Sequence, residues 1–364
     1  MLPSTPLYAA LMTLLRAGLW EKEPDDLSLF PLSDKDWTEL FRMARWQAVT
    51  GIVYLGVCRL PEGMWPPEKV MLQWTVAIDR IERRNRKVNE VLTELYGEWQ
   101  DYETPLVQKG QGVALFYEHP LWRECGDIDL YFSVGKHAEE TVAMMNTRGV
   151  SVKKSPDGSV FYRWKGVEVE HHTRLVDIYN PFVRSYLKRL ETAEGREVYC
   201  LPEQGGKIEV PSPALNLLLI NAHILKHALG RGIGLRQLCD MARACYCLHA
   251  KVTAGTMERI ARRTGMRKWN RLLHAFLVEH LGLPADCLPY PARSVTSRPL
   301  WSVVWKGGNF GMYPEGKSLL SGNRWTNKVN TLRSFLRNVC FSCSYAPKEA
   351  FWLMMNLLGG QLKK

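Results

Sequence analysis

The sequence predicts an α+β protein in which a mixed β-sheet with α/β character lies between an N-terminal and a C-terminal helical region. Three observations lead to this prediction. Apolar residues recur at helical spacing up to about residue 100, alternation with period two begins after Pro105, and helical spacing returns after Pro213. We therefore expect an N-terminal helical region (1–103), an α/β core (104–212) and a C-terminal helical lobe with a basic tail (213–364).

The N-terminal region contains three stretches with helical periodicity, at residues 7–20, 37–58 and 70–99. Proline and glycine separate these stretches. Ser33 lies three residues before Asp36, which is typical of a helix N-cap. We therefore expect helices throughout this region.

Short runs of alternating polarity follow in the core, and each predicts a strand: 106–109, 128–132, 160–164 and 167–172. Residues 136–148 have helical periodicity. Tight turns are expected at Gly158 and at Gly166. Together these elements predict a mixed α/β unit.

Helices are predicted again in the C-terminal lobe, at 215–229, 235–248, 257–264 and 269–281. Residues 294–324 are rich in glycine, serine and proline and predict irregular structure, whereas 329–358 predicts helix. From Pro291 to Lys364, eleven Lys or Arg residues stand against two acidic residues, so +9 of the net charge of +11 lies there. This basic tail could bind nucleic acid or an anionic membrane surface, and an amphipathic helix packed on the lobe explains the same pattern.

The composition excludes several classes of protein. A hydrophobic fraction of 46%, a charged fraction of 23% and thirteen tryptophans argue against disorder. The longest apolar stretch, 214–224, is far shorter than the roughly 20 residues of a transmembrane helix. The apolar segment 7–20 follows no basic residue and precedes no cleavage site, and the nine cysteines are odd in number. We expect a cytoplasmic protein with reduced thiols and no transmembrane segment.

The strongest chemical signal is the pair Asp127 and Asp129. Side chains at i and i+2 of a strand point to the same face, so the two carboxylates would lie side by side while Ile128 and Leu130 face the core. Mg²⁺ takes one or two carboxylates and completes its shell with water and substrate phosphates. The pair therefore predicts a Mg²⁺ site, and a solvated strand face is the alternative.

Glu168, Glu170 and His172 alternate along a later strand and would share one face. That strand can supply a third carboxylate, which two metal ions about 3.5–4 Å apart need in phosphoryl transfer. Glu170 is the preferred ligand and Glu168 the alternative, whereas His172 would orient Glu170 or contact substrate. A polar strand face turned toward water explains the same alternation.

A glycine-containing turn follows the first predicted strand, at Lys109 and Gly110. Backbone amides in such a turn can bind phosphates, with Lys109 as a point charge on them. Two histidines on a later helix, His223 and His227, lie at i and i+4, a spacing that can bind metal. Without a third ligand nearby in the sequence, we expect them to be packed polar residues.

The order of these motifs resembles that of the uncharacterised nucleotidyltransferases, a family in the polymerase-β-type nucleotidyltransferase superfamily. The motifs that carry the resemblance are Lys109-Gly110, Arg123, Gly126-Asp127-Ile128-Asp129-Leu130 and Glu170-His171-His172. Segments 223–227, 236–240 and 307–311 resemble the family as well, so the resemblance covers roughly residues 30–330. It implies a nucleotidyltransferase fold and Mg²⁺-dependent transfer of a nucleoside monophosphate from a nucleoside triphosphate, such as ATP, to a hydroxyl of an unspecified acceptor.

The resemblance also implies roles for individual residues. The catalytic and metal-binding carboxylates would be Asp127, Asp129 and Glu170, and substrate would be bound by Lys109, Gly110, Arg123 and His172. The superfamily usually has serine or glycine after the turn glycine, and Gln111 stands there in this chain. Two alternatives stay open: an inactive protein of this fold that binds RNA or an anionic surface through its basic lobe, and hydrolysis of a phosphoester at the same metals.

Overall fold

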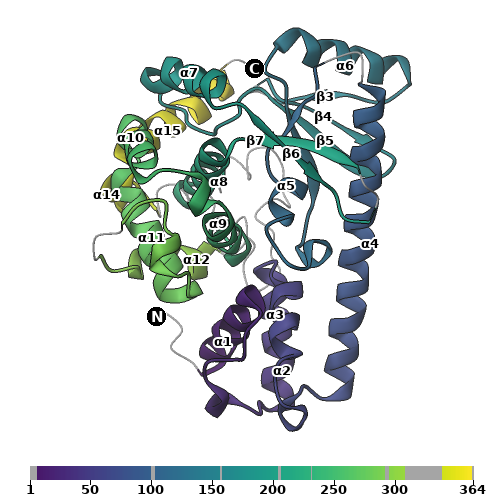
Figure 1. The fold of residues 1–364 in the computed structure, drawn as a ribbon, viewed down its shortest axis with the longest axis vertical. Coiled ribbons are helices and arrows are strands. Elements are labelled where there is room, and N and C mark those ends of the chain that lie inside the picture. Colours follow the sequence, from purple (N-terminus) through teal and green to yellow (C-terminus); the bar gives the residue numbers. More distant parts are fainter. Residues whose placement is uncertain are drawn as a thin grey trace.

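The computed structural model describes residues 6–99, 103–155, 158–203, 206–230, 232–291, 295–307 and 338–362. One seven-stranded sheet lies between helices that precede it in the chain and helices that follow it (Figure 1). This arrangement confirms the predicted α+β class and the mixed sheet flanked by two helical regions.

Among the described residues, the α-helices that precede the sheet are α1 (Pro6–Trp20), α2 (Asp34–Trp46), α3 (Thr50–Val57) and α4 (Glu68–Glu98). Ser33 caps α2, since its hydroxyl accepts a hydrogen bond from the Asp36 amide at 3.2 Å, as predicted. The stretch expected as one helix at 37–58 is two helices. The chain turns between them at Ala48, which has a positive φ of 53°.

The sheet has the strand order β3-β4-β5-β2-β1-β7-β6. Its strands are β1 (Leu106–Val107), β2 (Asp127–Tyr131), β3 (Lys153–Lys154), β4 (Val160–Trp164), β5 (Val167–His172), β6 (Arg196–Cys200) and β7 (Lys207–Pro211). β2 pairs in parallel with β5 and β1 with β7, and the other neighbours are antiparallel. The sheet is therefore mixed, and its two central strands carry the acidic residues that the sequence singled out.

Shorter helices connect the strands, and a helical lobe follows them. The connecting helices are α5 (Gln111–Ala114), α6 (Gly135–Thr147) and α7 (Arg184–Glu194). The lobe contains α8 (Pro213–Leu229), α9 (Leu235–Leu248), α10 (Ala254–Thr264), α11 (Arg267–Leu281), α12 (Arg298–Gly307), α14 (Val339–Tyr345) and α15 (Pro347–Leu362). Irregular structure was predicted for 294–324. This prediction is wrong at α12, where apolar residues from Leu300 to Val304 pack into the core. Much of the basic tail, at 308–337 and 363–364, lies outside the described residues.

The two faces of the sheet differ in character. Helices α4 and α6 cover one face, where Ile128, Leu130 and Val169 are buried in an apolar cluster with Leu92 and Met145. The opposite face carries the polar residues of β2 and β5 and turns toward α8 and α9 (Figure 1). A strand whose alternate residues are buried presents the others on this open face.

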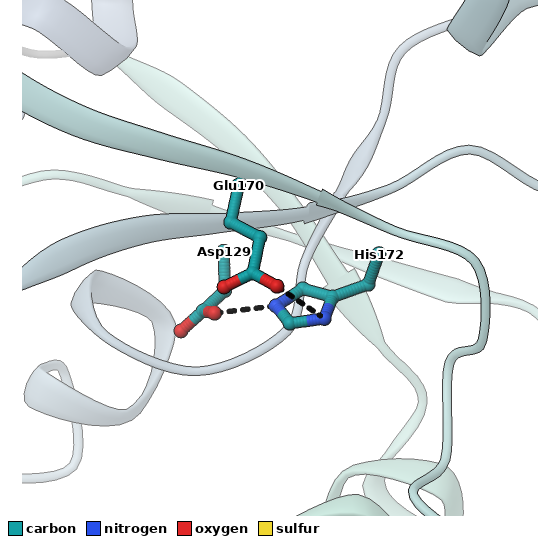
Figure 2. Close-up of side chains that lie close together, drawn as sticks. All are labelled: Asp129, Glu170 and His172. Atoms are coloured by element: carbon teal, nitrogen blue, oxygen red, sulfur yellow. Dashed lines mark hydrogen bonds and ion pairs between the residues drawn. The ribbon is translucent and has the colours of Figure 1, made fainter. Parts of the chain in front are cut away.

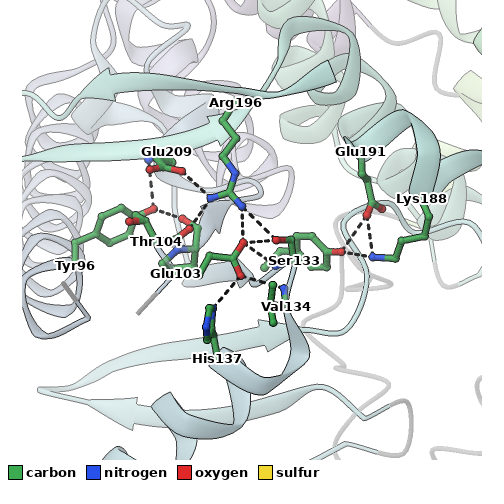
Figure 3. Close-up of polar contacts among 12 residues, drawn as sticks. Tyr96, Glu103, Thr104, Ser133, Val134, His137, Lys188, Glu191, Arg196 and Glu209 are labelled. Carbon is green, nitrogen blue, oxygen red and sulfur yellow. Dashed lines mark hydrogen bonds and ion pairs between the residues drawn. The ribbon is translucent and has the colours of Figure 1, made fainter. Parts of the chain in front are cut away.

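A polar network fixes the loop before α6 to the far edge of the sheet (Figure 3). The Glu103 carboxylate accepts hydrogen bonds from the amides of Ser133 and Val134, at 3.3 and 3.0 Å. Arg196 of β6 donates to the same carboxylate and to Glu209 of β7. Glu103 therefore satisfies amides at the start of α6 that the helix itself leaves unpaired.

None of the helices in the described ranges combines the length and the apolar character that a membrane crossing requires.

Candidate functional site

The central strands β2 and β5 bring four carboxylates to the open face of the sheet. Because these strands pair in parallel, Asp127 lies beside Glu168 and Asp129 lies beside Glu170. Ile128, between the two aspartates, is only 2% exposed on the other face. The alternation read from the sequence therefore places the acids on one side of the sheet.

Asp129, Glu170 and His172 form a compact group on this face (Figure 2). One ligand atom of each lies within 4.8 Å of the other two, and no other set of three such side chains does so among the described residues. His172 lies between the carboxylates: its Nε2 is 2.5 Å from Asp129 Oδ1 and its Nδ1 is 3.6 Å from Glu170 Oε1. Two carboxylates and an imidazole are donors that bind divalent cations, so this set fits a metal ion.

Lys109 adds a positive charge beside this group. Its Nζ lies 3.2 Å from Asp129 Oδ1, and both side chains are largely buried. Burial raises the pKa of the Asp129 carboxyl, but Lys109 and His172 outweigh burial and hold this pKa well below its usual range. Burial lowers the pKa of the Lys109 ammonium, and the negative charge of Asp129 more than reverses that effect. Both groups are therefore charged at neutral pH.

Asp127 lies at the exposed start of β2, and the pKa of its carboxyl shifts in the opposite direction to that of Asp129. The negative charge of Asp129 raises the pKa of the Asp127 carboxyl to about 6. Repulsion between two neighbouring carboxylates of this kind is relieved when a cation binds between them. Asp127 and Glu170 line the cavity between the sheet and helices α8 and α9, and both also line an adjoining cavity together with Glu168.

The turn after β1 closes one side of the site. Gly110 has φ +54° and ψ −114°, and a Cβ there would lie 3.3 Å from the Asp127 carbonyl oxygen. The backbone conformation therefore favours glycine, and the close approach to β2 leaves little room for a Cβ. Gln111 is 4% exposed and donates to Asn89 of α4, so its side chain points into the core.

These residues line a cavity of about 300 Å³ between the sheet and helices α8 and α9. On the helical side, Lys226 Nζ lies 3.1 Å from Asp177 Oδ1 and His223 Nδ1 lies 3.4 Å from Asp177 Oδ2. Arg236 of α9 lines the cavity as well and donates to the Glu124 carbonyl at 2.9 Å. The cavity therefore joins an acidic wall on the sheet to a wall of cations and imidazoles on the helices.

Arg123 reaches the same cavity, but Asp240 of α9 holds its guanidinium. Arg123 Nε and Nη2 each lie 2.7 Å from one oxygen of the Asp240 carboxylate, and the Tyr117 hydroxyl donates to it at 2.8 Å. The Arg123 and Asp240 side chains are 6% and 7% exposed. This buried bidentate pair joins the loop before β2 to the helical lobe.

Helix α4 supports that loop from the other side. Asn85 donates from its amide nitrogen to the carbonyls of Leu121 and Arg123, at 2.6 and 2.8 Å. Arg84 donates to the carbonyls of Gly126 and Gly166, at 2.8 and 3.2 Å. The start of β2 is therefore held by side chains from α4 and α9.

Comparison with known families places this site in context. The family described as uncharacterised nucleotidyltransferase matches residues 33–282, well over half of the chain. The chain belongs to this family. The resemblance read from the motifs is confirmed, and the nucleotidyltransferase match extends from the cap of α2 to the end of α11, which includes every residue of the site described above.

Other comparisons are sparse. Among curated proteins no significant match is found. Among solved structures, the chain is similar to an antigenic nucleotidyltransferase-like protein from Paracoccidioides brasiliensis, with 14% identity and a TM-score of 0.38, over 57% of this chain and 94% of that one.

The structure brings most of the predicted residues to one cavity. Those that line it are Lys109, Gly110, Arg123, Asp127, Asp129, Glu170 and His172. Glu168 does not line this cavity. Sequence reasoning missed Asp177, Lys226 and Asp240, and it expected His223 and His227 to be packed polar residues, whereas both line the cavity. The segment 236–240, which resembles the family in sequence, was the signal that pointed to Asp240.

Proposed function

We propose that this protein transfers a nucleoside monophosphate from a nucleoside triphosphate to a hydroxyl of an acceptor, with Mg²⁺ as cofactor. The observation that carries the proposal is the convergence of Asp127, Asp129 and Glu170 on one cavity that also contains Lys109 and the Gly110 turn. Membership of the nucleotidyltransferase family supports the same reaction.

In this proposal Asp127, Asp129 and Glu170 hold the metal ions. When bound, these ions would neutralise charge on the triphosphate and on the leaving pyrophosphate. His172 hydrogen-bonds to Asp129 and lies beside Glu170, and so keeps the two carboxylates in place. Glu168 lies outside the cavity that Asp127, Asp129 and Glu170 line, and this position favours Glu170 as the third carboxylate.

Phosphate binding falls to the cationic residues and the turn. Lys109 and Gly110 line the cavity together with the carboxylates, and Lys226 and Arg236 contribute positive charge from the helices. Arg123 lines the cavity while bonded to Asp240, so its contribution is to hold the loop before β2. Fixed charges of this kind, together with positioning, provide most of the rate in phosphoryl transfer.

The proposal also divides the chain as the sequence suggested. Residues 104–212 would form the catalytic domain, and the lobe at 213–364 would close the cavity through α8 and α9. The acceptor carries a hydroxyl.

Isothermal titration with each of the four ribonucleoside triphosphates and Mg²⁺ tests this function. We expect the wild type to bind at least one of them, and we expect Asp127→Asn/Asp129→Asn and Glu170→Gln to lose that binding while they stay folded by circular dichroism. Glu168→Gln is the matched control and should retain binding. Failure of the folded wild type to bind any triphosphate would instead favour a non-catalytic protein that uses its basic lobe.

A further inference from the structure

A histidine faces the carboxylates across the cavity and takes no part in the function proposed so far. His223 lies on α8, the first helix after the sheet, and lines the cavity together with Asp129 and Glu170. The only hydrogen bond that His223 makes among the described residues is to Asp177, in the segment that follows β5. The pair therefore connects the helical lobe to the chain just beyond the third carboxylate.

Asp177 is itself held in place. Its second oxygen accepts a hydrogen bond from Lys226 at 3.1 Å, and its side chain is 19% exposed. Burial raises the pKa of the Asp177 carboxyl, but His223 and Lys226 outweigh burial and keep this pKa well below its usual range. An ionised Asp177 accepts the Nδ1 proton of His223, so the lone pair of the neutral imidazole lies on Nε2.

The surroundings keep His223 uncharged at neutral pH. Burial, followed by the positive charge of Lys109, lowers the pKa of His223 to about 4. The His227 ring packs edge-on against it, with ring centroids 4.4 Å apart. The titratable and charged groups that act on His223 lie on the sheet, in the segments that follow β1 and β5, and on α8. They are Lys109, Asp129, Asp177, Lys226 and His227.

A proton acceptor that binds no metal ion would keep its full basicity during the transfer. A carboxylate that binds a divalent cation loses much of its basicity, because the ion stabilises the ionised form. Glu170 belongs to the group of possible ligands, and His172 is bonded to Asp129. A neutral imidazole on the opposite wall, held by a carboxylate at Nδ1, is the arrangement that accepts a proton at Nε2.

We infer that His223 is the general base of the proposed transfer and that Asp177 is the residue that positions it. The acceptor oxygen forms a bond to the α-phosphorus, its proton passes to His223 Nε2, and the bond from the α-phosphorus to the bridging oxygen breaks. Pyrophosphate leaves with that electron pair, and the Asp177 carboxylate stabilises the resulting imidazolium. This inference rests on the proposed function, and it places the acceptor hydroxyl between α8 and the carboxylates.

Release of pyrophosphate from the triphosphate that binds, with Mg²⁺ and with water or glycerol as the acceptor, provides the test. We expect His223→Gln to lower the rate by about 10²–10⁴-fold, the usual contribution of a general base. Its affinity for the triphosphate should remain that of the wild type. Hydroxide must replace the missing base, so the rate of the variant should rise with pH between about 6.5 and 9, where the wild-type rate is level.

Two further variants make the test specific. Asp177→Asn should lower the rate at least about tenfold without loss of triphosphate affinity, because asparagine can accept the Nδ1 proton but cannot stabilise an imidazolium. Asp177→Asn also tests the inference if His223→Gln fails to fold. His249→Gln, at a partly exposed histidine that bonds to the Tyr246 carbonyl, is the matched control and should keep the wild-type rate.

The outcomes separate the inference from the function on which it rests. The role of His223 would be overturned, and the transferase function retained, if the wild type releases pyrophosphate and His223→Gln does so at a rate within about threefold of the wild-type rate. The same conclusion would follow if His227→Gln loses more of the rate than His223→Gln does. A wild type that releases no pyrophosphate from any of the four triphosphates would overturn both.

Discussion

The buried pair of Arg123 and Asp240 allows a quantitative prediction about stability. Asp240→Ala removes the carboxylate that accepts two hydrogen bonds from Arg123, each at 2.7 Å, and one from Tyr117. Both charged side chains are less than 10% exposed, so water cannot readily replace the lost partner. The variant leaves a guanidinium buried without a counter-charge.

The expected loss follows from this burial. Breaking a buried ion pair by removing one partner typically costs about 3–5 kcal/mol, because the remaining charge stays in a medium of low polarity. The Tyr117 hydroxyl also loses its acceptor, at a cost of about 1–3 kcal/mol, but contacts within one network do not add independently. We therefore expect Asp240→Ala to lower the free energy of unfolding by about 3–5 kcal/mol.

Urea denaturation followed by circular dichroism measures this loss. Asp79→Ala is the control, because the Asp79–Arg83 pair on α4 has a similar distance of 2.9 Å but side chains that are 52% and 76% exposed, and such pairs contribute little. The double variant Arg123→Met/Asp240→Leu should regain most of the stability, since an apolar pair leaves no charge unpaired. A loss in Asp240→Ala no larger than that in Asp79→Ala would refute the reasoning.

The carboxylates, the glycine turn and the Glu103 network each allow a further test. The neighbouring carboxylate raises the pKa of Asp127 to about 6, so below that pH a metal ion must displace a proton in order to bind. Mn²⁺ affinity measured by calorimetry should therefore fall up to about tenfold per pH unit below pH 6. An affinity that does not depend on pH would contradict this prediction. The same repulsion predicts that Asp127→Asn raises the melting temperature in EDTA at neutral pH. Gly110→Ala should weaken triphosphate binding in titrations, because its backbone conformation strains other residues by about 1–3 kcal/mol, whereas Gly135→Ala, with open space around the new Cβ, should not. Glu103→Gln should lower the free energy of unfolding, measured by urea denaturation, by about 1–3 kcal/mol. The reason is that the variant loses the charged hydrogen bonds of Glu103 to Arg196 and to the amides before α6. Unchanged stability would contradict this role of Glu103.

Local patterns in the sequence predicted much of the fold. The strands β4 and β5 have the predicted bounds, because alternation of buried and exposed residues is a property of each strand alone. The same alternation predicted that Asp127 and Asp129 lie on one face of the sheet. Helices such as α9, which has the predicted range Leu235–Leu248, could likewise be predicted from the spacing of apolar residues.

Long-range pairing accounts for what the sequence could not provide. Strands β6 and β7 were not predicted. β6 lies at the sheet edge, where its Val198 is 60% exposed, so it lacks the usual apolar pattern. Arg123 was expected to bind substrate, and its partner is Asp240, 117 residues later. No local pattern indicates which distant acid will meet a given arginine, or that Asp177 will orient His223.

The most direct test of the account is the position of metal and nucleotide in a crystal structure. Crystals grown with Mn²⁺ and a non-hydrolysable analogue of the triphosphate that binds would show the metal by anomalous scattering. We predict Mn²⁺ bound by Asp127, Asp129 and Glu170, with the triphosphate against Lys109 and the Gly110 turn. Mn²⁺ or nucleotide at another site, with these carboxylates free, would contradict the proposed function.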